Sequence, residues 1–213
     1  IYSEDIINKY ILDNLKEFKS DERKEIGEIS KRILLDKENF VIEKQYIKNK
    51  IKSFIYEEPF IFIDGFVKFR LRDLDIFMST VVDKGVKEFT AKKEYKEFVD
   101  VLKYFIDVQQ PKYDVVNLVF RDNNYVLLDK KNNIIDKNYF EDIIFEIKPE
   151  EISQDDLLIS TLIVLAPSSL IVHLDQQHKD ADIVKVLTDV FEDRVYFCLG
   201  CEKCKKEVKI ENS

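Results

Sequence analysis

The stretch that decides the fold is residues 64–111, DGFVKFRLRDLDIFMSTVVDKGVKEFTAKKEYKEFVDVLKYFIDVQQP. The first half has apolar residues in alternating steps of four and three, which places them on one face of a helix. These residues are Val67, Leu71, Leu74, Met78 and Val81, with Gly85 in the next place and Phe89 after it. The spacing predicts a long amphipathic helix that Asp64 caps.

A second apolar series follows and ends at Pro111, which cannot continue a helix. It consists of Tyr95, Phe98, Val99, Leu102, Phe105 and Ile106. We predict that this second helix joins the first near residues 89–91 and folds back on it as a hairpin, so that both apolar faces are buried.

Residues 59–69, PFIFIDGFVKF, have a local alternative. Two apolar runs around an Asp-Gly pair are typical of a β-hairpin. We favour the helix, because the face that begins at Val67 continues in register through Leu71 and Leu74. The alternative stays open at this point.

Three more helices are predicted before this stretch. Ser3 begins the first, Ser20 the second and Asn39 the third, which Pro59 ends. Their apolar faces carry Ile7, Ile11, Leu15 and Phe18, then Ile26, Ile29 and Ile33, then Ile47, Ile51 and Phe54. Residues 1–111 are therefore predicted to form a bundle of five helices.

After Pro111 short Val- and Leu-rich runs replace the helical spacing. They predict a β-hairpin (114–121 and 125–129), helices (139–147 and 153–166), a strand (170–174), a helix that Asp180 caps, and a last strand (194–198). A strand, a helix and a strand in succession form a βαβ unit, whose strands lie parallel. The predicted fold class is α+β, a helical bundle followed by a small mixed β-sheet domain. The predicted domains are 1–111 and 112–206, with a tail at 207–213.

The charge of the chain excludes one class of function. Residues 1–110 carry a net charge of −1 and the remaining residues −7. Neither half has the basic surface of a nucleic-acid-binding protein, so we predict no nucleic-acid binding.

Residues 157–174 lack acids, lysine and arginine, but Pro167 divides them. A spanning helix needs roughly 20 apolar residues, so we predict a buried helix and strand here and no membrane span. The first residue is Ile, which indicates a piece of a longer chain.

Three cysteines in seven residues form the sharpest local motif, Cys198-x-x-Cys201-x-x-Cys204. An odd, clustered set is no disulfide framework, and it indicates a cytoplasmic protein. Thiolates at this spacing can reach one Zn²⁺ ion, which needs a fourth ligand. His173 or His178 can supply it, because each lies near the carboxyl end of a strand expected to be parallel to the one that Cys198 ends. An iron–sulfur cluster, a redox site and simple packing of the thiols remain alternatives.

Catalytic motifs are missing from the sequence. There is no glycine-rich phosphate loop, nucleophile elbow or HExxH motif, and no catalytic residue can be named. Whether the protein is an enzyme stays open, and the sequence favours a non-enzymatic protein.

Four segments resemble a known family: GFVKFRL (65–71), KEYKEFVDVLKYFIDVQQPKYDVV (93–116), DLLISTLIVLAP (156–167) and GC (200–201). They are similar to the YtxC-like sporulation proteins of endospore-forming bacteria. The resemblance implies a role in endospore formation in the cytoplasm of such a bacterium, and it implies no catalytic residue.

Two hypotheses follow. In the first, the protein is a non-enzymatic sporulation factor whose helical half contacts a protein partner; its oligomeric state is not readable from the sequence. In the second, it is a metal-binding or redox protein that uses the three cysteines and a nearby histidine.

Overall fold

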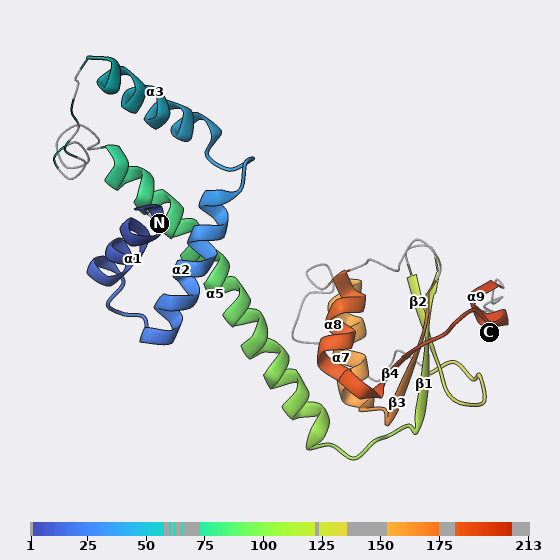
Figure 1. The fold of residues 1–213 in the computed structure, drawn as a ribbon. Coiled ribbons are helices and arrows are strands. Elements are labelled where there is room, and N and C mark those ends of the chain that lie inside the picture. Colours follow the sequence, from blue (N-terminus) through green and yellow to red (C-terminus); the bar gives the residue numbers. More distant parts are fainter. Residues whose placement is uncertain are drawn as a thin grey trace. The chain divides into compact units, whose positions relative to one another are not determined.

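The computed structural model describes residues 2–57, 60, 62, 65, 73–121, 124–135, 153–174 and 182–205. The helices are α1 (Tyr2–Asn14), α2 (Ser20–Leu35), α3 (Val41–Glu57), α5 (Asp73–Asp107), α7 (Gln154–Leu165), α8 (Asp182–Phe191) and α9 (Glu202–Lys205). The strands are β1 (Val115–Arg121), β2 (Asn124–Leu128), β3 (Ser169–His173) and β4 (Val195–Phe197), and the 3₁₀ turn η3 (Glu192–Arg194) precedes β4. The change from helices to strands occurs after Pro111, as predicted (Figure 1). The fold class is α+β.

The chain divides into two compact units, residues 1–95 and 96–213. The core of the first unit is formed by the predicted faces of α1, α2 and α5. Its buried residues include Ile7, Ile11, Ile26, Ile29, Leu74, Met78, Val81 and Phe89. The predicted residues of α3, namely Ile47, Ile51 and Phe54, pack against this core but are only partly buried.

Gly85 allows α2 and α5 to approach closely. A Cβ atom at Gly85 would lie 2.1 Å from the Ser30 Oγ and 3.2 Å from the Ser30 Cβ. The two helices are also joined by ion pairs between Lys92 and Glu25 (2.7 Å) and between Lys93 and Glu22 (2.8 Å). Lys92, Lys93 and Glu25 are 44–70% exposed, and only Glu22 is more buried, at 16%. Such ion pairs add little stability, so the close contact depends mainly on the absence of a side chain at Gly85.

The predicted helical hairpin is wrong. Residues 73–107 form one continuous helix, α5, with no turn near residues 89–91. The physical reason is that Glu88–Glu94 contains Ala, Lys and Glu, which favour a helix, and neither Gly nor Pro. The described residues of both apolar series lie on this one helix. Leu74 to Phe89 of the first series belong to the core of the first unit, whereas Val99 and Ile106 of the second series are buried in the second unit. The predicted start at Asp64 and the residues Val67 and Leu71 lie outside the described residues.

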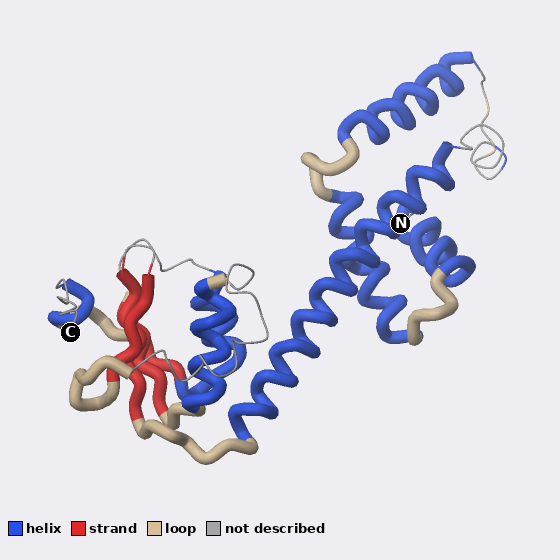
Figure 2. The backbone as a smooth tube through the Cα atoms, turned by 180° about the vertical axis from the view of Figure 1, so that it is seen from behind, coloured by secondary structure: helices blue, strands red, loops and turns tan. Residues whose placement is uncertain are grey.

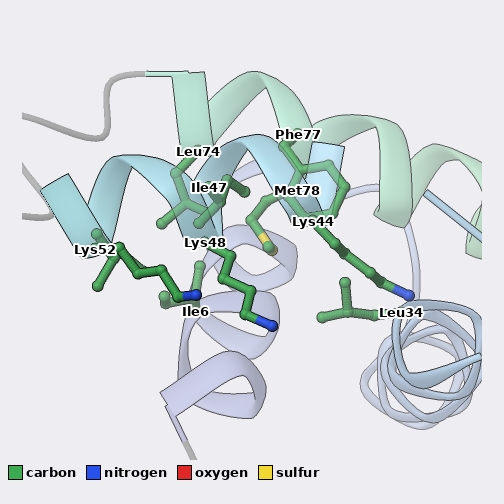
Figure 3. Close-up of a pocket in the computed structure, with 10 residues that line it drawn as sticks. Ile6, Leu34, Lys44, Ile47, Lys48, Lys52, Leu74, Phe77 and Met78 are labelled. Atoms are coloured by element: carbon green, nitrogen blue, oxygen red, sulfur yellow. The ribbon is translucent and has the colours of Figure 1, made fainter. Parts of the chain in front are cut away.

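A pocket of about 400 Å³ lies where α3 meets α1, α2 and α5 (Figure 3). Its apolar lining comes from Ile6, Leu34, Ile47, Ile51, Leu74, Phe77 and Met78. Three lysines at successive turns of α3, Lys44, Lys48 and Lys52, complete the lining. None of the described residues that line the pocket is acidic, so the pocket combines an apolar floor with a positive rim.

The second unit contains a four-stranded sheet in the order β2-β1-β3-β4. β1 and β2 form the predicted antiparallel hairpin, whereas β1 with β3 and β3 with β4 are parallel. Thus β3, α8 and β4 form the predicted βαβ unit. Helices α7 and α8 lie on one face of the sheet, and α9 lies on the other (Figures 1 and 2).

The core of this unit lies between the sheet and the two helices. Leu118 of β1 and Leu170 of β3 are fully buried, as are Leu158, Leu162 and Leu187 of the helices. The last turns of α5 belong to this unit: Gln109 donates to the carbonyl of Ile163 in α7, and Asp107 pairs with Arg194 at 2.7 Å.

Helix α7 begins and ends as the sequence predicts. The Ser153 hydroxyl accepts a hydrogen bond from the backbone N–H of Asp156, which caps the helix. Ala166 ends it in a left-handed conformation (φ 41°), and Pro167 follows. The predicted helix at 139–147, the cap at Asp180 and the tail after residue 205 lie outside the described residues.

The contact at Gly85 gives a stability prediction. Gly85→Val should lower the free energy of unfolding by about 1–3 kcal/mol, because the new side chain overlaps Ser30 and forces α2 and α5 apart. Thermal and denaturant unfolding, followed by circular dichroism, measures the change. Thr80→Val, at an exposed position of α5, is the matched control and should change stability little. Equal stability of the two variants would contradict the close contact.

Candidate metal centre

The register of β3 and β4 places Cys198 beside His173. Val172 pairs with Phe197 in the parallel ladder, and the backbone N–H of Cys198 donates to the carbonyl of Val172 at 2.9 Å. The next residue along each strand is therefore His173 on β3 and Cys198 on β4. Paired residues of neighbouring strands lie about 5 Å apart and point to the same face of the sheet.

A tight turn brings the other two cysteines back to this point. Gly200 has a φ of 118°, in a region that a residue with a Cβ atom adopts only under strain. The short helix α9 starts directly after Cys201, and the Cys204 N–H donates to the Cys201 carbonyl at 3.1 Å. The Sγ atoms of Cys201 and Cys204 consequently lie 3.9 Å apart.

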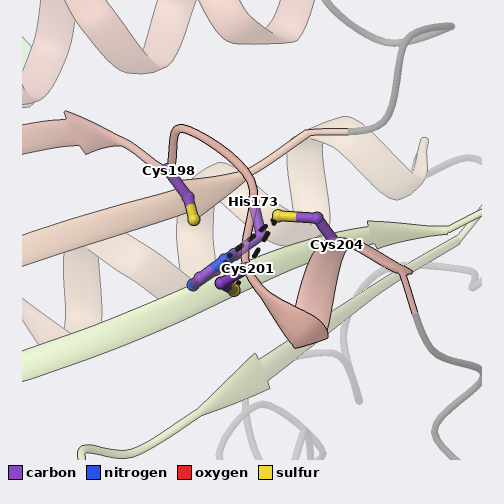
Figure 4. Close-up of side chains that lie close together, drawn as sticks. All are labelled: His173, Cys198, Cys201 and Cys204. Atoms are coloured by element: carbon purple, nitrogen blue, oxygen red, sulfur yellow. Dashed lines mark hydrogen bonds between the residues drawn. The ribbon is translucent and has the colours of Figure 1, made fainter.

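Four potential ligand atoms converge (Figure 4). The Nδ1 atom of His173 lies 3.4 Å from the Sγ of Cys201 and 3.6 Å from the Sγ of Cys204. Cys198 completes the group, and all four ligand atoms lie within 4.8 Å of one another. The three thiols form no disulfide.

These distances fit one tetrahedral ion. Zinc–sulfur bonds of about 2.3 Å and zinc–nitrogen bonds of about 2.0 Å put tetrahedral ligand atoms about 3.8 Å (S to S) and about 3.5 Å (S to N) apart. The separations between Cys201, Cys204 and His173 are close to these values. In an iron–sulfur cluster several atoms separate the protein ligands, so its ligand atoms lie further apart. The donor set and its spacing fit a single zinc ion.

The second ring nitrogen of His173 is also engaged. Its Nε2 atom lies 3.0 Å from the Oδ1 of Asn117 in β1, and both side chains are buried, each 4% exposed. The Lys203 ammonium of α9 donates to the same oxygen at 3.1 Å. A metal-ligating histidine usually makes such a contact, which fixes the orientation of its ring.

The electrostatic surroundings favour a neutral imidazole. Burial lowers the pKa of His173, and the nearby charge of Lys203 lowers that pKa further. Burial raises the pKa of Cys201. Hydrogen bonds from the backbone N–H groups of Cys204 and Lys203 and from the other thiols lower this pKa more, and the result is a pKa below the ordinary thiol value. Burial raises the pKa of Cys204. A neutral imidazole and an easily ionised thiol are metal-binding forms.

Of the five residues predicted as metal ligands, the structure brings together His173, Cys198, Cys201 and Cys204. His178 lies outside the described residues. Sequence reasoning missed Asn117 and Lys203. A signal for Asn117 was available, because it is the polar residue in the otherwise apolar run Val115–Phe120.

The profile of the YtxC-like family matches residues 1–196. The chain belongs to the YtxC-like family. The matched part contains His173 and ends before Cys198, so the quoted resemblance at Gly200 and Cys201 lies beyond it.

A protein of Bacillus subtilis (strain 168), named "Uncharacterized protein YtxC", is 26% identical over 160 residues. The alignment covers 71% of this chain, and the chain spans about half (53%) of that relative. No solved structure matches the chain significantly. In the described part of the chain, no helix is both long and apolar enough to cross a membrane.

The turn at Gly200 gives a prediction for metal affinity. Gly200→Val should weaken Co²⁺ or Zn²⁺ binding roughly 5- to 30-fold, because a left-handed residue with a Cβ costs about 1–2 kcal/mol. No atom lies within 4 Å of the new Cβ, so backbone strain alone accounts for the loss. Chelator competition measures the affinity, and Leu199→Val, at the neighbouring exposed position, should leave it unchanged. An unaltered affinity for Gly200→Val would show that the turn does not hold the thiols in place.

Proposed function

We propose that this chain acts in endospore formation as a non-enzymatic protein that contacts another protein, in the cytoplasm of a spore-forming bacterium. Its membership in the YtxC-like family supports the process, because the resemblance of residues 65–71, 93–116 and 156–167 to this family implies a role in endospore formation. The unbridged cysteines support a reducing compartment. The chain spans about half of the length of its relative, so the activity and the partners of the whole protein are part of what we propose.

The surface of α3 supports the protein contact. No side chain of α3 is fully buried, and Val41, Ile42 and Tyr46 are mostly exposed. Ile42 and Tyr46 line one pocket. The pocket with an apolar floor and the rim of Lys44, Lys48 and Lys52 is a second one, which shares Ile47 and Phe77 with the first (Figure 3). Such a surface fits a partner helix with an apolar face and acidic residues that meet Lys48 and Lys52.

A genetic test separates this surface from a general effect of charge. Deleting the gene in its spore-forming host should lower the number of heat-resistant spores, and the wild-type gene should restore them. A Lys48→Glu/Lys52→Glu variant should restore them poorly, because it repels an acidic partner. The control Lys24→Glu/Lys87→Glu makes the same charge change at exposed positions away from the pocket and should restore them fully.

Normal spore numbers in the deletion strain would contradict the role in endospore formation. Full restoration by the Lys48→Glu/Lys52→Glu variant would instead contradict only the surface. Both variants should show the same thermal unfolding as the wild type, since the substituted side chains are exposed.

A second function rests on one specific observation, the convergence of four ligand atoms within 4.8 Å. We propose that His173, Cys198, Cys201 and Cys204 hold a structural zinc ion. Four protein ligands are typical of structural zinc sites, whereas catalytic zinc keeps one position open. A redox dithiol needs only two sulfurs, so a redox role would not explain why the imidazole and the third thiol also face the same point.

The zinc ion would supply folding free energy. The sheet has α7 and α8 on one face (Figures 1 and 2). On the other face, residues 198–204, here called the cysteine loop, contact His173 and include most of the short helix α9 (Figure 4). A four-residue helix is too short to be stable alone. Ligation by Cys201 and Cys204 would fix this loop to β3 and β4.

Metal analysis tests this second function. The purified protein should contain about one Zn²⁺ per chain, and X-ray absorption should give zinc–sulfur distances of about 2.3 Å. Chelation should increase hydrogen exchange after Arg194 and leave α1 and α2 unchanged, because all four ligands belong to the second unit. Cys204→Ser should bind zinc more weakly, and Glu202→Gln, in the same short helix, should not.

The opposite result is a protein that is metal-free after reducing purification, takes up no Co²⁺ or Zn²⁺, and shows the same exchange with and without chelator. It would show that the four side chains form an unliganded cluster.

A further inference from the structure

Asn117 is a buried polar residue in the middle of the sheet. It lies on β1 between Val116 and Leu118, both fully buried, and is itself 4% exposed. Because adjacent residues of a strand point to opposite faces, its side chain faces away from α7 and α8. A buried amide without partners is costly, so its contacts indicate what it does there.

The contacts of Asn117 fix the orientation of its amide group. The Lys203 ammonium lies 3.1 Å from one end of the amide, and an ammonium can only donate a hydrogen bond. The other end lies 3.2 Å from the Asp129 carbonyl, which can only accept. The end near Lys203 is therefore the oxygen and the end near Asp129 is the NH₂ group.

This orientation determines the state of His173. The oxygen of Asn117 lies 3.0 Å from Nε2 of the ring and must accept a hydrogen bond from it. The proton of the neutral imidazole is consequently on Nε2, and the lone pair is on Nδ1. Nδ1 is the atom that faces the sulfurs of Cys201 and Cys204.

The same oxygen also contacts the segment that carries these two sulfurs. Lys203 lies between Cys201 and Cys204 in the sequence, and its ammonium reaches Asn117 on β1. One amide thus contacts both the imidazole and the cysteine loop. Three thiolates around a divalent ion leave a net charge of −1, which the positive charge of Lys203 offsets.

We propose that Asn117 is a positioning residue of the metal centre: it holds His173 as the tautomer with Nε2–H, so that Nδ1 is the ligand, and it aligns the cysteine loop through Lys203. This inference rests on the proposed zinc site. Removal of the hydrogen-bond partner of a ligating histidine typically weakens metal affinity by roughly 10- to 100-fold.

The first experiment uses the wild-type protein. Long-range ¹H–¹⁵N spectra of His173, with and without Zn²⁺, should show a protonated Nε2 in both states and a metal-bound Nδ1 in the loaded state. Ligation through Nε2, or a proton on Nδ1 in the zinc-free protein, would overturn the inference while leaving the zinc site intact.

The second experiment measures Zn²⁺ and Co²⁺ affinity by chelator competition. Asn117→Ala should bind both ions roughly 10- to 100-fold more weakly. Asn117→Asp keeps an acceptor for Nε2–H and for Lys203, and should recover most of the affinity. Both variants lose the contact with the Asp129 carbonyl, so the difference between them reports the acceptor together with the charge of the carboxylate. Asn124→Ala, at an exposed position of β2, is the matched control and should bind as the wild type does.

The outcomes separate the two proposals. Equal affinity of Asn117→Ala and wild type, with a Co²⁺ spectrum that still shows three sulfurs and one nitrogen, would overturn the role of Asn117 only. No uptake of either ion by the wild type would overturn the zinc site and this inference together. Unchanged circular dichroism of the variants verifies that they fold.

Discussion

The arrangement of the second unit depends on the parallel pairing of β3 with β4. Leu170 and Val172 point toward α7 and α8 and are completely buried, so His173 must point to the opposite face of the sheet. A register shift of one residue would reverse both faces, and it would place an imidazole in the core. Burial of two apolar side chains thus fixes where the histidine lies, and the ladder then fixes Cys198 beside it.

The two faces of the sheet are covered in different ways. Apolar helices cover one face. The other carries the buried residues Val119 and Leu128 beside Asn117 and His173, which lie under the cysteine loop. A small domain has little apolar surface to bury, and ligand bonds are a common substitute for a second core. The proposed zinc site is consistent with this division, since its ligands come from β3 and from the cysteine loop that follows β4.

The helical unit depends on a close approach of α2 and α5. Gly85 leaves room for Ser30, and the buried residues Ile26 and Val81 pack in the same core. α3 lies over this core without burying a side chain completely, which leaves the lysine-rimmed pocket open. The tightly packed helices therefore provide a rigid support, and α3 provides the accessible surface.

The sequence by itself determined most of the helices and strands. Spacing and capping residues, which act locally, gave the helical faces up to Phe89, the hairpin of β1 and β2, the Ser153 cap of α7 and the parallel βαβ unit. The sequence also determined which residues could ligate a metal. The continuity of α5 was also present in the sequence, because residues 88–94 favour a helix and contain neither Gly nor Pro. The hairpin prediction assumed that the two apolar series pack against each other. The βαβ pattern also predicted that a histidine could reach the three thiols. Only the tertiary structure placed Asn117 behind His173, because the contacts of Asn117 with His173 and Lys203 join residues 56 and 86 positions apart, and no local pattern records such distances.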